Sequence, residues 1–248
     1  MVAASRQVQQ VIRERASEQA FFGVSALLFA ACATVTVVWC GSMSAMGGMS
    51  MPGGWTMSMA WMRMPDQSWS SAAGSFVGMW TVMMVAMMLP SLVPMLMRYR
   101  RAVGDVREAR LGRLTTLVGV GYFLVWIAFG VAAFPVGVAL TACTMQLPSL
   151  ARAVPIAVGG VVVIGGALQF TAWKARHLAC CRGAMACGCR LPADAATAWR
   201  HGARLGLHCT YCCAGLTAIL LVVGVMDLRA IRNSPATTTT APMARATA

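Results

Sequence analysis

Charged side chains are scarce in this chain of 248 residues, and acidic ones are the scarcest. Asp and Glu together number 7, against 20 Lys and Arg, and charged residues make up only 11% of the sequence. A soluble domain usually carries about 25% charged residues, so the composition argues against a soluble protein. The acids nearest to an apolar segment are Asp66 and Asp227, which gives no support to paired-carboxylate or triad chemistry. We therefore expect a protein that is not an enzyme and has neither catalytic nor cofactor-binding residues.

The basic residues give the chain a formal net charge of +13. A basic excess is typical of proteins that bind nucleic acid or an anionic surface. Here the charges are confined to short segments between long uncharged runs, so we expect no nucleic-acid partner. Hydrophobic residues reach 58%, and the lipid bilayer is the partner that such a composition predicts.

The uncharged runs are long enough to cross a membrane as helices, since about 20 apolar residues span the hydrocarbon core. They are too long and too continuous for barrel strands. The predicted fold class is therefore all-α: a polytopic transmembrane helical bundle of about five helices. We expect these helices near residues 20–40, 74–97, 115–140, 153–174 and 206–227.

The basic residues also predict the orientation. Fifteen Lys and Arg lie before the first predicted helix or in the segments that follow the second and fourth predicted helices. The segments that follow the first and third predicted helices hold only Arg63 and Arg152. Positively charged loops favour the cytoplasmic side, so the amino terminus is predicted to be cytoplasmic and residues 41–66 to lie outside. We expect one transmembrane domain over residues 1–228, including this Met-rich outer loop, and a disordered polar tail over 229–248.

Methionine is concentrated in one part of the chain, with fifteen of the twenty Met between residues 43 and 97. The outer loop is rich in Gly, so packing in a hydrophobic core does not explain its Met residues. A thioether is a soft ligand that suits Cu(I), and it does not form disulfides outside the cell. The alternative is an apolar loop on the bilayer surface, anchored by Trp side chains. The outer residues in question are Met43, Met46, Met49, Met51, Met57, Met59, Met62 and Met64.

The second predicted helix continues this pattern. Met side chains spaced by four residues share one helical face, and Pro90 and Pro94 predict a kink beside them. We interpret the series as a track of ligands, while the ordinary role of Met as a flexible core filler stays open. The helix carries Met79, Met83, Met84, Met87, Met88, Met95 and Met97.

Seven of the ten Cys lie between residues 180 and 213. Cys209 and Cys213 are one helical turn apart at the predicted inner end of the last helix, and His177 and Cys181 follow the inner end of the fourth. Thiolates and imidazoles bind Cu(I), and four of them can hold Zn(II). We expect Arg176, Arg182 and Arg204 to favour the thiolates. Of the other histidines, His201 is predicted to be a surface residue. The candidate metal ligands are Cys209, Cys212, Cys213, His177, Cys181, His208, Met83, Met84, Met87, Met88, Met49, Met51, Met57 and Met59.

Four stretches resemble a bacterial family of predicted metal-binding integral membrane proteins that carry a domain of unknown function. The stretches begin at Met83 (MMVAMMLPS), Gly121 (GYFLVW), Leu168 (LQFT, leading to Lys174) and Cys209 (CTYCC), and together they cover residues 76–228. His177 stands where the family has a Cys, and the sixth helix usual in the family is not evident after Asp227. The resemblance implies metal binding in the bacterial inner (plasma) membrane, with copper handling as the plausible role.

Three classes of function follow. The first is a Cu(I)-binding membrane protein, for uptake or for delivery to a copper-dependent membrane enzyme or a copper chaperone, with zinc as the second metal. In it, the outer Met loop and the second helix pass Cu(I) to an inner Cys/His site. The second is a membrane thiol–disulfide oxidoreductase using the Cys209–Cys212 spacing, which leaves the clustered Met unexplained. The third is a non-catalytic membrane subunit whose Met residues only pack.

Overall fold

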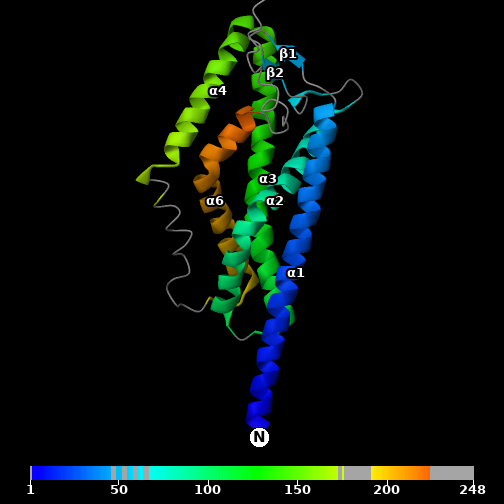
Figure 1. Cartoon of the computed structure of the whole chain (residues 1–248), viewed down its shortest axis with the longest axis vertical. Helices are drawn as coiled ribbons and strands as arrows, with labels where there is room; N and C mark the ends of the chain where they lie inside the picture. Colours follow the sequence, from blue (N-terminus) through cyan, green and yellow to red (C-terminus); the bar gives the residue numbers. More distant parts are fainter. Residues whose placement is uncertain are drawn as a thin grey trace, which may run out of the picture.

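The protein is a bundle of long helices that run alternately up and down (Figure 1). The computed structural model describes residues 2–45, 49–51, 55–57, 61–63, 67–104, 106–172, 175 and 191–223. Within these ranges, five helices are long and apolar enough to cross a membrane, which confirms the predicted fold class. They are α1 (Val2–Ala45), α2 (Trp69–Val103), α3 (Glu108–Gln146), α4 (Pro148–Leu168) and α6 (Ala195–Val223).

Every helix other than α4 extends well beyond its predicted span, because polar and charged residues at the ends continue the helix. The largest extension is at α1, which begins at Val2 rather than near residue 20. Helix α6 begins at Ala195 rather than near residue 206. Asp194 precedes it, and its carboxylate accepts a hydrogen bond of 2.8 Å from the Thr197 amide, which is a helix cap. This bond holds the pKa of the Asp194 carboxyl below its usual value. The apolar run therefore marks only the second part of α6.

Helix α3 is the centre of the bundle and packs against α2, α4 and α6. Its contact with α6 is made by glycines that let the two backbones touch, as is common between membrane helices. A Cβ atom on Gly202 would lie 2.1 Å from the Val118 carbonyl oxygen, and one on Gly206 would lie 2.7 Å from that of Tyr122. The spacing of these glycines, four residues apart on α6, fixes which side chains of α3 and α6 meet.

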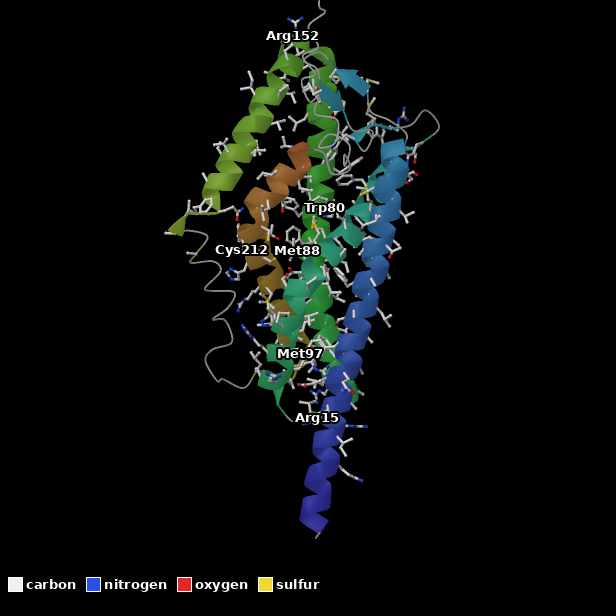
Figure 2. The ribbon with its side chains drawn as sticks, in the orientation of Figure 1. Arg15, Trp80, Met88, Met97, Arg152 and Cys212 are labelled. Atoms are coloured by element: carbon white, nitrogen blue, oxygen red, sulfur yellow. The ribbon has the colours of Figure 1, made fainter. Side chains whose placement is uncertain are left out.

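The two ends of the bundle differ in character. At one end, which we call the basic end, Arg100 of α2 pairs with Glu108 of α3 at 3.2 Å and donates to Ser17 of α1 at 2.6 Å. At the other, strands β1 (Met49–Met51) and β2 (Trp55–Met57) form an antiparallel hairpin. Part of the predicted outer loop is thus ordered structure, and α1 continues into it as far as Ala45. In Figure 2, Arg15 and Arg152 mark these opposite ends.

Candidate metal centre

Three sulfur atoms from two helices come together in the middle of the bundle. The Cys209 Sγ lies 4.0 Å from the Sδ of Met88 and 4.0 Å from the Sγ of Cys213. Met88 is on α2 and both cysteines are on α6. In Figure 2, Met88 and the neighbouring Cys212 lie at similar heights, well away from Arg15 and Arg152. We call Met88, Cys209 and Cys213 the sulfur cluster.

The spacing within the sulfur cluster fits a single soft metal ion. A metal–sulfur bond of about 2.3 Å, the value for zinc thiolates, places the sulfurs of a trigonal site about 4.0 Å apart. Both measured separations agree with that value. Thiolate and thioether ligands favour Cu(I) over harder metals. Two of the three edges of such a trigonal site are therefore present around Cys209, and the donor set suits Cu(I).

The depth of the sulfur cluster corrects the prediction that Cys209 lies at the inner end of its helix. Cys209 is the fifteenth of the 29 residues of α6, which places it at the centre of the helix. At about 1.5 Å per residue, roughly 21 Å of helix separates it from Ala195. The prediction was wrong because it took the start of the apolar run for the start of the helix.

The other predicted ligands on α6 occupy different places. His208 is half-buried and lies about 100° around the helix from Cys209, so the two side chains leave α6 in different directions. Cys212 is buried. His177 and Cys181 lie outside the described residues, as does Met59. Among the residues that the structure describes, there is no group of three or more His, Cys, Asp or Glu side chains that could hold a metal ion.

The methionines of α2 divide into two groups. Met79, Met83 and Met84 are buried in the core of the bundle, which leaves their role as core fillers open. Met87 is 44% exposed and points away from that core, so it is not part of a continuous ligand track through the bundle. Met88 is half-buried and is the α2 thioether with a measured contact to a cysteine sulfur. The helix itself continues through Pro90 and Pro94.

The outer methionines of the hairpin share one face. Met49 pairs with Met57 and Met51 with Trp55 across the two strands, and alternate residues point to the same side of a strand. Met51 and Met57 are buried against Ala151 at the start of α4, while Met49 is 40% exposed. The Trp55 indole donates a 2.9 Å hydrogen bond to the Ala151 carbonyl, which anchors the hairpin. Three thioethers thus gather on one face, with one of them open to solution.

The residue that sequence reasoning missed is Tyr122 of α3. Its hydroxyl donates a 2.9 Å hydrogen bond to the Cys209 Sγ, and its side chain is 1% exposed. The contact follows from the close approach of α3 and α6 at Gly206, whose backbone touches that of Tyr122. The chain has only 3 Tyr, and a phenol in the middle of an apolar span requires a polar partner. The need of Tyr122 for a polar partner within the bundle is the sequence signal that could have identified it, and a search for metal ligands alone overlooked it.

Two further expectations change at the basic end. His201 is half-buried and stacks on the Tyr99 ring at 5.5 Å, so the surface role predicted for it is wrong. Arg204 is exposed and lies about 140° around α6 from Cys209, on a different face from the cysteine it was expected to influence. Arg176 and Arg182 lie outside the described residues. Tyr122, by contrast, is a polar neighbour of the sulfur cluster through its hydrogen bond to Cys209.

Comparison with known proteins identifies one family. A family model described as PpoB2, copper chaperone, matches residues 77–240. The match includes Met88, Tyr122, Cys209 and Cys213, and it begins after the hairpin with its outer methionines. Searches of the curated proteins and of the solved structures found no match.

Proposed function

The chain belongs to the PpoB2 family of copper chaperones, and from this premise we propose that it binds one Cu(I) ion at the sulfur cluster and delivers it to a partner protein. The observation that carries the proposal is that the Cys209 Sγ lies 4.0 Å from both the Met88 Sδ and the Cys213 Sγ. All three lie within residues 77–240, the region that the family model matches. The proposed role is binding and transfer of copper, without catalysis.

Copper selectivity in this proposal comes from the donor set. A site of two thiolates and one thioether suits Cu(I), which accepts soft ligands and low coordination numbers. Structural Zn(II) sites usually take four ligands in a tetrahedron. We therefore propose copper as the cargo.

The outer hairpin is the proposed place of capture. Met49, Met51 and Met57 share one face of it, and the exposed Met49 gives an incoming ion its first ligand. Thioethers bind Cu(I) less strongly than thiolates, so transfer from the hairpin to Cys209 and Cys213 is favourable. We propose that the chain lies in the bacterial inner membrane with its amino terminus in the cytoplasm. A copper-dependent membrane enzyme or a soluble copper chaperone then accepts the ion.

Replacing Met49, Met51 and Met57 together by Leu tests the capture step. We expect loading from a dilute Cu(I) chelate to slow about tenfold, which corresponds to about 1.4 kcal/mol of lost binding at first encounter. The final copper content is expected to stay unchanged, because the sulfur cluster is intact. Elemental mass spectrometry of samples taken during anaerobic loading measures both quantities.

The control for this variant is Met145→Leu, which changes an exposed Met of α3 outside the hairpin. It is expected to load at the wild-type rate. Equal loading rates in the triple variant and the wild type would remove the hairpin from the proposed route. Loss of bound copper at equilibrium would move the main site to the hairpin.

A further inference from the structure

Tyr122 is held against the sulfur cluster by the backbone rather than by a flexible contact. Gly206 of α6 packs on the Tyr122 carbonyl, and a Cβ at Gly206 would lie 2.7 Å from that oxygen. The phenol ring is buried, and its hydroxyl reaches the Cys209 Sγ at 2.9 Å. A hydroxyl placed in this way constrains the side chain of Cys209, whose sulfur contacts the sulfurs of both Met88 and Cys213.

The charge of the loaded site gives this hydrogen bond its importance. Two thiolates and one Cu(I) ion carry a net charge of −1, and an uncompensated charge is costly in the interior of a membrane bundle. Arg204, the nearest Arg or Lys along α6, lies on a different face from Cys209. A hydrogen bond to an ionised acceptor is roughly twice as strong as one between neutral groups. The Tyr122 hydroxyl is placed to supply such a bond to the copper-bound sulfur.

We propose that Tyr122 is a positioning residue of the copper site: its hydroxyl directs the Cys209 sulfur toward Met88 and Cys213 and remains hydrogen-bonded to that sulfur when Cu(I) is bound. This inference rests on the proposed function, because it concerns the same site. Its consequence is that Tyr122 sets how tightly copper is held. Without the hydroxyl, the same three sulfurs hold the ion more weakly and release it to an acceptor sooner.

The test compares Tyr122→Phe with Tyr99→Phe in the full chain. Both variants remove one hydroxyl from a buried tyrosine and keep the ring. The Tyr99 hydroxyl has no hydrogen-bond partner within the described ranges and does not contact the cluster, so it is the matched control. We expect Tyr122→Phe to weaken Cu(I) affinity at least tenfold in competition with bicinchoninate, and Tyr99→Phe to change it less than twofold.

A second readout separates positioning from a merely structural effect. Removing a hydrogen bond from a thiolate raises the energy of its lone pairs, so the ultraviolet charge-transfer band of the Cu(I)–thiolate site is expected to move to longer wavelength in Tyr122→Phe alone. Wild-type affinity and an unshifted band in a folded Tyr122→Phe variant would overturn the inference. Should that variant fail to fold, the resonance Raman doublet of tyrosine in the wild type decides. We expect it to change on copper loading, and an unchanged doublet overturns the inference.

The failure of this inference is distinguishable from failure of the proposed function. A wild-type protein that retains no Cu(I) against bicinchoninate contradicts the proposed copper site itself. A wild-type protein that binds Cu(I), together with a Tyr122→Phe variant that matches it in both affinity and band position, contradicts only the role of Tyr122.

Discussion

A chain in which Cys209 and Cys213 are both replaced by Ser is expected to retain less than about a tenth of the copper that the wild type binds after anaerobic loading. The two thiolates supply the charge and most of the ligand strength at the sulfur cluster, and a serine hydroxyl is a hard, weak donor for Cu(I). Met88 alone then remains as a ligand. Elemental mass spectrometry of copper per chain, after removal of loosely bound ions by a chelator, measures the effect.

The control is Cys143→Ser, which removes an exposed thiol from α3 and is expected to leave the copper content unchanged. It shows that the loss in the double variant is specific to the sulfur cluster. Full copper retention in the double variant would contradict the proposed site. A wild-type protein that holds no copper and carries Cys209 and Cys213 in oxidised form would favour the thiol–disulfide oxidoreductase instead.

Replacing Gly202 by Ala is expected to destabilise the bundle by about 1–3 kcal/mol or more, the usual cost of forcing extra volume into a packed interior. The added Cβ would lie 2.1 Å from the Val118 carbonyl oxygen, and it would meet backbone rather than a side chain that can move aside. Helices α3 and α6 must then separate. Because the neighbouring contact at Gly206, on the same α3–α6 interface, brings Tyr122 to Cys209, copper affinity is expected to fall together with stability.

Gly119→Ala is the matched control, since a Cβ at this position of α3 meets no atom within 4 Å. It adds the same methyl group without a clash, so stability should stay equal or rise slightly through better helix propensity. Thermal unfolding in detergent and chelator competition measure stability and affinity for both variants. A Gly202→Ala protein as stable as the wild type would show that close α3–α6 packing does not determine the fold.

The spans of the bundle were predictable from the sequence, whereas the depth of the site was not. Long uncharged runs identify the helices, and the spacing of Cys209 and Cys213 by one turn correctly puts both on one face. Hydropathy does not show where a helix begins, however. Arg200 and Arg204 belong to α6 although they interrupt the apolar pattern. Because of them, the first turns of α6 were not predicted as helix. The cysteines consequently lie at the centre of the helix.

Contacts between helices account for the rest of what the sequence did not predict. Nothing in the spacing of the α2 methionines distinguishes Met88 from Met87. Which of the two contacts Cys209 depends on how α2 faces α6. The hairpin carried a local signal that was not used: Met49, Met51, Trp55 and Met57 alternate with polar residues on either side of a Pro-Gly-Gly segment. That pattern is typical of two short paired strands.

The most direct test of the central claim is the sulfur coordination of copper in the loaded protein, measured by X-ray absorption at the copper edge. We expect Cu(I) with three sulfur neighbours at about 2.3 Å in the wild type. Met88→Leu is expected to leave two, and Met87→Leu, which changes the exposed neighbour, to leave three. Copper surrounded by nitrogen or oxygen in the wild type, or an equal sulfur count in all three proteins, would contradict the proposed site.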